Sequence, residues 1–498
     1  MNRPIRNLAT GCLVLFLALI ANATYLQFFK ADDLTSLTKH PNNARVSNAA
    51  FSAPRGDILV NGRAVAHSKK SDDEFKYLRT YRFGAEYAHV AGFFARGRIG
   101  AVEASENSVL TGESPELFVN RVGDILSNKP PAGGNVSLTI NAAAQRAAYE
   151  GLKKLGNNVR GAVVAIEPST GKILAMVSSP TFNPNRLATH DFPKANATYL
   201  RLLKNDLVPL NNRAIEERLP PGSTFKLVTA AAALSSGKFT PDSLVPGGAS
   251  LDLPLTSKNL PNENGGSCGA SKITLTRALD VSCNVAFGSV GLKLGADALR
   301  EQAEKFGFNK KSYFTDLDDP LTSQVTSIFP TKVDAPQTAY SAIGQFEVSA
   351  TPLQMAMVSA AIANNGRVMK PYLVNEILSS DLDVIKGFNP EPLNPDSPQA
   401  ISAGVASKLT EMMVSVVDNG TGRPARIPGI AVAGKTGTAQ SAPKRPPYAW
   451  FTSFAPADNA RVAVAVLIQD AGVERDQISG GGLAAPIAKA VMEAVLDR

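Results

Sequence analysis

The chain has 498 residues, of which 44% are hydrophobic and 19% are charged. This length is too great for one ordinary domain, and the composition is that of a globular protein rather than a disordered one. The net charge of +8 is spread along the chain. It indicates a solvated basic surface or attraction to an anionic membrane or wall, and no basic block is dense enough to predict nucleic-acid binding.

The first thirty residues predict a membrane anchor. Arg3 and Arg6 precede an uncharged, mostly apolar stretch, 7–29, that ends at Lys30. A helix of about 20 residues crosses the bilayer core, so this stretch is long enough. The two arginines predict a cytoplasmic N-terminus, with one membrane pass and the bulk of the chain outside.

The alternative for this stretch is a cleaved signal peptide. Residues 8–20 would be its apolar region, and Ala21-Asn22-Ala23 would be a cleavage site with small residues. However, Tyr25 and Phe28 continue the apolar run, and aromatic residues are typical of the membrane interface. We therefore expect an anchor.

Residues 31–126 predict a mixed region without a catalytic constellation. Residues 55–62 are rich in turn formers and predict a hairpin around Asn61-Gly62, and residues 103–112 have a helical pattern. A Pro/Gly linker follows at 128–134. The chain therefore divides into a cytoplasmic tip and anchor (1–30), an N-terminal pedestal or interaction domain (31–135) and a larger domain (136–498).

The larger domain predicts an α/β fold of the α+β type, an antiparallel sheet flanked by helices. Short apolar runs between turn signals predict strands, and longer alanine-rich runs predict helices. The predicted strands are 136–140, 161–166, 172–178, 430–434, 450–454 and 462–468. The predicted helices are 142–155, 224–234, 355–363 and 485–496.

A Ser-x-x-Lys sequence provides a candidate nucleophile at Ser223, with Lys226 as its base. The pattern occurs five times, but only the Ser223 copy begins a long apolar helix. Residues i and i+3 share a helix face, and burial together with the helix dipole favours a neutral lysine that can take the serine proton. For an isolated match, a capping serine with a surface lysine is the commoner arrangement.

A second pattern, Ser-x-Asn, occurs three times, and the copy at Ser282-Cys283-Asn284 follows an apolar helix. The Ser282 hydroxyl can relay a proton between Lys226 and a leaving group, and Asn284 can hold a substrate amide or the lysine. The structural alternative is a serine and an asparagine at a helix end.

The third pattern, Lys435-Thr436-Gly437, occurs once, on a predicted strand. Lys435 would attract a carboxylate, Thr436 and Thr438 would donate hydroxyls to it, and Gly437 would let a substrate approach the strand. The alternative is a strand edge protected by a lysine. Each motif is weak alone, but all three in order, each on a suitable element, predict one acyl-transfer site.

Histidine and cysteine usage narrows the chemistry. None of the four histidines lies near the three motifs, which argues against a Ser-His-Asp arrangement, and no cluster has metal-ligand spacing. We expect no metal and no cofactor. Cys268 and Cys283 would lie in the oxidising space outside the membrane, where they form either a disulfide beside the site or two free thiols.

The motif set resembles that of the penicillin-interacting serine acyltransferases. Further matching residues are 161–166 with Thr170-Gly171, Gly344-Gln345 and 351–354, and the upstream part resembles class B penicillin-binding proteins. The resemblance implies a serine β-lactamase/transpeptidase-like fold in the bacterial cell membrane. It also implies that Ser223 attacks the D-Ala-D-Ala bond of a peptidoglycan stem peptide, with the amides of Ser223 and Thr438 as the oxyanion hole.

The resemblance further implies that β-lactams acylate Ser223 and that a polytopic glycan polymerase of the shape, elongation, division or sporulation family is a partner. Two alternatives remain open at this point. The same acyl-enzyme could be resolved by water, as in a D,D-carboxypeptidase or β-lactamase, or the chain could be a non-catalytic β-lactam sensor or scaffold. Intact motifs argue against the scaffold.

Overall fold

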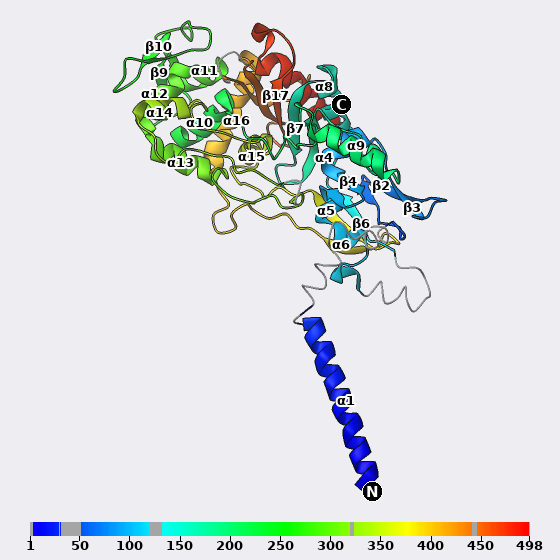
Figure 1. Cartoon of the computed structure of the whole chain (residues 1–498). Coiled ribbons are helices and arrows are strands. Elements are labelled where there is room, and N and C mark those ends of the chain that lie inside the picture. Colours follow the sequence, from blue (N-terminus) through cyan, green and yellow to red (C-terminus); the bar gives the residue numbers. More distant parts are fainter. Residues whose placement is uncertain are drawn as a thin grey trace.

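The computed structural model describes residues 3–28, 30, 51–118, 132–318, 323–440 and 446–497. Helix α1 (Arg3–Phe28) is exposed along its length and is drawn in dark blue in Figure 1. Among the described residues it is the one helix that is long and apolar enough to cross a membrane. It overlaps the apolar stretch predicted as the anchor, 7–29. The helix begins four residues before that stretch and ends one residue before its end.

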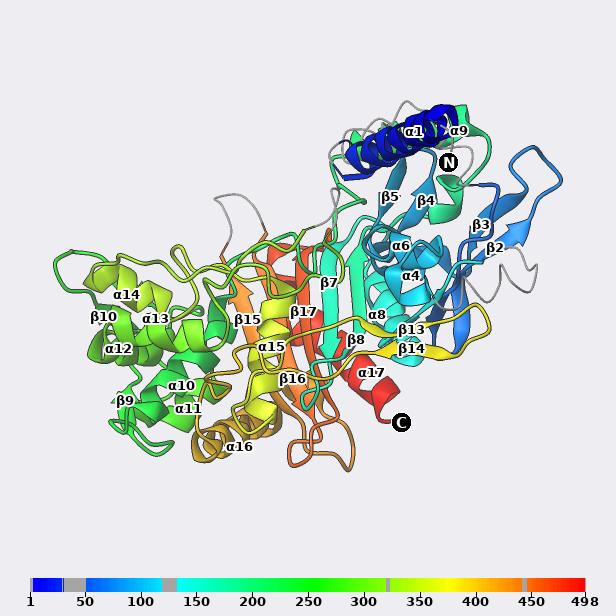
Figure 2. The same cartoon turned by 90° about the horizontal axis from the view of Figure 1, so that it is seen from below.

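The N-terminal part of the chain is built around a six-stranded sheet with the order β14-β13-β6-β1-β2-β3. Strands β2, β3, β13 and β14 of this sheet are labelled in Figure 2. Strands β1 and β6 are parallel, and the other pairs are antiparallel. The sheet therefore joins strands far apart in sequence. They are β1 (Ile58–Val60), β2 (Arg63–Lys70), β3 (Tyr77–Tyr81), β6 (Asn135–Leu138), β13 (Val374–Leu378) and β14 (Val384–Gly387).

The hairpin between β1 and β2 confirms the turn predicted at Asn61-Gly62. Both residues have positive φ, 47° and 72°, as a two-residue hairpin turn of the primed type requires. The helical prediction for 103–112 is only partly right, because the segment is broken at Glu106 (φ −103°, ψ 22°) into α5 (Val102–Ser105) and α6 (Asn107–Leu110).

The remaining elements of this part cover the sheet or connect it to the rest. The linker residues predicted at 128–131 lie outside the described residues. The elements are α4 (Gly84–Ala91), β4 (Phe93–Ala95), β5 (Arg98–Gly100), η1 (Pro115–Leu117), η2 (Pro184–Arg186) and α9 (Phe192–Leu203).

A cluster of buried charges holds the N-terminal sheet to α5. Glu103 is fully buried and accepts hydrogen bonds from Arg55 at 2.9 Å, Arg79 at 2.6 Å and the Tyr81 hydroxyl at 2.9 Å. Burial raises the pKa of Glu103, but the two guanidinium groups outweigh it and leave that pKa below its usual value. This Arg55–Glu103–Arg79 cluster is therefore ionised and paired.

The second sheet confirms the predicted antiparallel sheet flanked by helices, but the strand predicted at 136–140 forms β6 of the first sheet instead. The strand order of the second sheet is β15-β16-β17-β7-β8, and all its pairs are antiparallel. The strands are β7 (Arg160–Ile166), β8 (Ile173–Ser179), β15 (Ala433–Ala439), β16 (Tyr448–Ala455) and β17 (Val462–Asp470).

Helices cover both faces of this sheet (Figure 2). Alternate residues of β7 enter different cores: Val163 packs in the cluster that contains α8 (Ala142–Lys154) and α17 (Ala485–Val495), and Val164 packs in the cluster that contains α15 (Pro352–Ala363). Because strand side chains alternate between faces, these clusters are the two sides of one sheet.

A helical region lies beside β15, on the left in Figure 2. The three motifs converge where this region meets β15. Its helices are α10 (Lys226–Ser235), α11 (Leu275–Asp280), α12 (Asn284–Leu294), α13 (Ala296–Lys305), α14 (Ala335–Ser341) and α16 (Ala403–Asn419). Its short strands are β9 (Leu244–Pro246), β10 (Ser250–Asp252), β11 (Asn259–Pro261) and β12 (Lys272–Thr274).

Candidate active site

Ser223 lies in a 3-10 turn, η3 (Gly222–Phe225), and the α-helix begins at Lys226 rather than at the serine. Gly222 has φ 54°, and a Cβ on it would lie 2.9 Å from the Ala439 Cβ of β15. Glycine therefore lets this turn pack directly against the strand. Ser223 keeps 7% of its surface exposed, whereas Lys226 is fully buried.

The second motif surrounds the Lys226 amine. Its Nζ lies 2.6 Å from the Ser282 carbonyl oxygen, 2.8 Å from Asn284 Oδ1 and 3.3 Å from Ser282 Oγ. Ser282 has φ 59°, a left-handed conformation that is uncommon for a residue other than glycine. In this conformation its carbonyl and its hydroxyl both lie next to Lys226.

The third motif brings a second lysine to the same hydroxyl. Lys435 Nζ donates to Ser282 Oγ at 2.9 Å and to the Thr436 carbonyl at 2.8 Å. The Ser282 hydroxyl therefore lies between two buried lysine nitrogens. Among the described residues, no hydrogen bond joins Lys226 directly to the Ser223 hydroxyl.

Burial is the main influence on both lysines. It lowers the pKa of Lys226 well below its usual value, and the charge of Lys435 lowers it further, against an opposing effect of Glu263. Burial also lowers the pKa of Lys435 to about 7, against Glu263 and Asp280. A neutral Lys226 can accept a proton, and Lys435 carries its positive charge below about pH 7.

Gly437 is a point of close approach between β15 and the turn that carries Ser223. A Cβ on Gly437 would lie 2.9 Å from the Pro221 carbonyl oxygen and 3.0 Å from the Thr224 methyl group. Any side chain would push the turn away from the strand. Close packing therefore requires a glycine at this position. This requirement adds to the predicted role of Gly437, which is to let a substrate approach the strand.

Two cavities meet at these motifs. A cavity of about 1170 Å³ includes Ser223, Asn284 and Thr438 in its lining. A neighbouring one of about 390 Å³ includes Ser282, Thr436 and Thr438. The Thr436 hydroxyl is 2.6 Å from the Thr421 hydroxyl, so the smaller cavity has a wall of hydroxyl groups. The predicted residues therefore come together around one cleft, with the two lysines beneath it.

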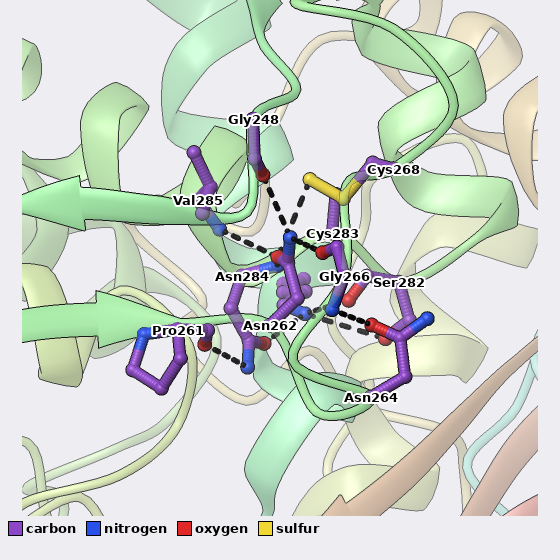
Figure 3. The surroundings of a disulfide bond; sticks show 11 residues. Gly248, Pro261, Asn262, Asn264, Gly266, Cys268, Ser282, Cys283, Asn284 and Val285 are labelled. Carbon is purple, nitrogen blue, oxygen red and sulfur yellow. Dashed lines mark hydrogen bonds between the residues drawn. A yellow bond between two sulfur atoms is a disulfide. The ribbon is translucent and has the colours of Figure 1, made fainter.

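Cys268 and Cys283 are joined in a disulfide, with an S–S distance of 2.11 Å and a Cα–Cα distance of 5.9 Å. Figure 3 shows this bond beside Asn262, whose Oδ1 accepts from the backbone N–H groups of Asn284 (3.0 Å) and Val285 (3.1 Å). The loop after β11 is thus tied to the Ser282 turn by a covalent bond and by hydrogen bonds.

Several residues of the cleft belong to none of the three motifs. Asn262 and Glu263 come from the loop after β11, and Thr421 follows α16. Asp280, at the end of α11, lines neither cavity, but its charge acts on Lys435. The sequence carries no pattern that selects these positions. The only hint was the nearby Cys268, because a disulfide to the Ser-x-Asn motif brings its loop to the site.

Comparison with known proteins places this geometry in a family. The model of the penicillin-binding protein transpeptidase domain matches residues 161–493, and that of the penicillin-binding protein A dimerisation domain matches residues 55–136. The chain belongs to the penicillin-binding protein transpeptidase family. This confirms the resemblance to class B penicillin-binding proteins, and both matches lie within the described body apart from 119–131 and two short loops.

Two similar members of the penicillin-binding transpeptidases are mycobacterial. The peptidoglycan D,D-transpeptidase PbpA of Mycolicibacterium smegmatis is 41% identical over 100% of this chain and 99% of its own length. The protein of the same name from Mycobacterium tuberculosis is 40% identical over the same shares. The chain therefore spans both relatives almost completely.

A solved structure of a penicillin-binding transpeptidase also matches. The ceftriaxone acyl-enzyme complex of penicillin-binding protein A from M. tuberculosis superposes with a TM-score of 0.85 at 39% identity, covering 90% of this chain and 100% of that one. The penicillin G acyl-enzyme complex of the same protein gives a TM-score of 0.83 at 40% identity, covering 89% and 100%. The fold and the serine acyltransferase class predicted from sequence are confirmed.

Proposed function

We propose that this class B penicillin-binding transpeptidase crosslinks peptidoglycan stem peptides through an acyl-enzyme on Ser223. The observation that carries the proposal is the Ser282 hydroxyl held between two buried lysines, together with Ser223 in the lining of the large cavity. A neutral lysine and a bridging hydroxyl supply the proton transfers that acyl transfer needs.

Acylation follows from this geometry. Ser223 Oγ attacks the penultimate D-alanine carbonyl of a D-Ala-D-Ala end, and its proton passes to neutral Lys226. A neutral amine has two N–H donors and one lone pair. The two short contacts to the Ser282 and Asn284 oxygens use the donors, which leaves the lone pair as the acceptor.

The released D-alanine takes its proton through Ser282. Its hydroxyl accepts from Lys435 at 2.9 Å and lies 3.3 Å from Lys226, so it connects the base to the leaving nitrogen. The backbone N–H groups of Ser223 and Thr438 form the oxyanion hole, where losing one donor costs about 10²–10³ in rate. Lys435 and the hydroxyls of Thr436 and Thr438 hold the terminal carboxylate of the donor, with Gly437 leaving room along the strand.

An amine of a second stem peptide then attacks the ester and forms the crosslink. β-Lactams acylate the same serine. The acyl-enzyme complexes of the M. tuberculosis protein support this for a relative 39–40% identical to the present chain.

The proposed setting is the outer face of a bacterial cell membrane. Helix α1 is the anchor, and Arg3 and Arg6 on its N-terminal side keep that end cytoplasmic. In this division residues 1–30 are the tip and anchor, 31–135 the pedestal and 136–498 the transpeptidase domain. Strands β13 and β14 of the last range complete the sheet of the pedestal. Protease digestion of intact spheroplasts tests the orientation, because an exported body is cleaved from outside.

A polytopic glycan polymerase is the proposed partner. The region between the anchor and the transpeptidase domain has about 100 residues, shorter than a glycosyltransferase domain of the class A kind, so another protein would have to polymerise the strands. Co-purification of the full chain with such a polymerase in detergent tests this, and it should depend on residues 1–135.

Labelling with a fluorescent penicillin tests the nucleophile. We expect one stable covalent label on the wild type and none on Ser223→Ala. Ser235→Ala is the matched control, because Ser235 belongs to another Ser-x-x-Lys copy at the end of α10. Rapid loss of the label would indicate a β-lactamase, and absence of labelling in the wild type would contradict the proposal.

A further inference from the structure

The charged groups of the active site suit one of the two substrates of the reaction better than the other. Lys226 and Lys435 are both fully buried, and their hydrogen bonds go to hydroxyl, amide and carbonyl oxygens rather than to carboxylates. Such a site suits the carboxylate of an acyl donor. An acceptor that carries an ammonium group at neutral pH would be repelled by any positive charge there.

Glu263 supplies a negative charge where the two cavities meet. It is exposed, and it lines both the cavity that contains Ser223 and the smaller cavity that contains Ser282. Thr438 and Ser479 also line both, so Glu263 is the one ionisable residue among those shared by the two linings. Its charge acts on both lysines and raises the pKa of each, against the stronger effect of burial.

The backbone that carries Glu263 is held in place by the residue before it and by the disulfide of the same loop. The neighbouring Asn262 is 7% exposed, and its Nδ2 donates to the carbonyls of Gly248 (2.9 Å) and Gly266 (2.8 Å). Its Oδ1 accepts from two N–H groups of the Ser282 turn and of α12, and the disulfide closes the same loop (Figure 3). These contacts fix the backbone position of Glu263 beside the two cavities.

We propose that Glu263 binds the ammonium group of the acyl acceptor and forms the acceptor subsite of this enzyme. This inference rests on the proposed function, because it concerns the second half of the same reaction. The proposed ligand is a primary amine that is protonated in solution. It binds where the two cavities meet.

The reaction that follows balances without a further reagent. The acceptor R–NH3⁺ first loses one proton to solvent, and the free amine nitrogen attacks the ester carbon. As the C–N bond forms and the bond to Ser223 Oγ breaks, a second proton passes from nitrogen through Lys226 to Oγ. The products are an amide and the free serine. Glu263 concentrates and orients the amine and forms no covalent bond.

The test compares how a cationic and an uncharged acceptor react with the same acyl-enzyme. Full-length enzyme in detergent is acylated by a benzoyl-D-alanyl thioester, and the products of hydrolysis and aminolysis are separated by chromatography. The cationic acceptor is Nα-acetyl-D-lysine amide, and the uncharged one is hydroxylamine at pH 7.5. We expect Glu263→Gln to lower the ratio of aminolysis to hydrolysis about three- to tenfold for the lysine amide, and to leave it unchanged for hydroxylamine.

Glu474→Gln is the matched control. Glu474 is also exposed and lines the larger cavity, but it does not line the smaller one, and the same charge is removed. We expect Glu474→Gln to keep the wild-type ratio and Glu263→Asp to recover most of it. An unchanged ratio in Glu263→Gln, an equal loss with hydroxylamine, or an equal loss in Glu474→Gln would overturn the inference.

The same experiment separates this inference from the proposed function. Formation of the acyl-enzyme is measured in the first step by release of the thiol. If the wild type releases no thiol, the proposed function fails. If acylation is normal and the acceptor ratios do not change in Glu263→Gln, the acceptor subsite alone fails. Melting temperatures of the variants exclude a general loss of folding.

Discussion

The protein buries charged side chains in two places, and in only one of them are positive and negative groups paired. In the N-terminal sheet, Glu103 lies between Arg55 and Arg79, with each ion pair at 2.6–2.9 Å. In the active site, Lys226 and Lys435 share the Ser282 hydroxyl, and no carboxylate lies within salt-bridge distance of either amine among the described residues. Pairing keeps the first cluster ionised, whereas the lack of pairing favours neutral amines in the second.

We expect the paired cluster to stabilise the fold and the unpaired cluster to serve the reaction. A paired carboxylate and guanidinium hold a fixed arrangement, because breaking the pair leaves an uncompensated charge in the interior. An unpaired buried lysine gives up its proton instead, which is the state a general base requires. The first cluster should therefore control stability without affecting chemistry, and the second should do the reverse.

Lys226→Ala should give the largest effect on the reactive side. Removing the base should lower the acylation rate by about 10²–10⁴ or more, because the Ser223 proton then has no acceptor. The melting temperature should stay the same or rise, since a buried amine is removed. Stopped-flow acylation with a fluorescent penicillin and thermal unfolding measure the two quantities. Acylation near the wild-type rate would refute the role of Lys226 as base.

Glu103→Gln should have the opposite pattern. It leaves two buried guanidinium groups without their counter-charge, so the free energy of unfolding should fall by about 3–5 kcal/mol. Molecules that remain folded should acylate at the wild-type rate. Asp297→Asn is the control, because its exposed pair with Arg300 should contribute less than about 1 kcal/mol. A loss of acylation without a loss of stability would break the comparison.

The pH dependence should show the smallest of these effects. Lys435 has a pKa of about 7, so it is charged below pH 7 and loses its charge above. For a donor with a free carboxylate, KM should therefore rise about tenfold per pH unit well above pH 7. A donor ester without that carboxylate should show no such rise. Steady-state kinetics at pH 6–9 with both donors measure the difference, and parallel KM profiles would contradict it.

Much of the fold and site followed from local sequence patterns. The hairpin at Asn61-Gly62, the strands β7, β8, β16 and β17 and the anchor helix were predictable, because turn residues and apolar periodicity report directly on backbone geometry. The three motifs were predictable because each combines a reactive side chain with a recognisable element. One detail of the Ser223 segment was wrong: Ser223 sits in a 3-10 turn, and the α-helix begins three residues later, at Lys226.

The parts that escaped prediction depend on contacts distant in sequence. Nothing local identifies Glu103 as the partner of Arg55, since the two lie 48 residues apart and join only when the sheet forms. Glu263 gains its place in the cleft from the contacts of Asn262 and from the disulfide. Strand β14 joins the sheet only by pairing with β13. Strand β13 is short, and its partner β6 lies more than 200 residues earlier in the chain.

That last pairing has a consequence for the order in which the protein can fold. Strand β6 has an open edge until β13 arrives, and β13 is encoded about three quarters of the way along the chain. During synthesis the N-terminal sheet therefore remains incomplete, with one unpaired edge, until β13 has been made. Most strands of the second sheet have not been made by then either. The segment 55–136 should accordingly be a poor independent folding unit, and the final assembly of the pedestal is a late event in biogenesis.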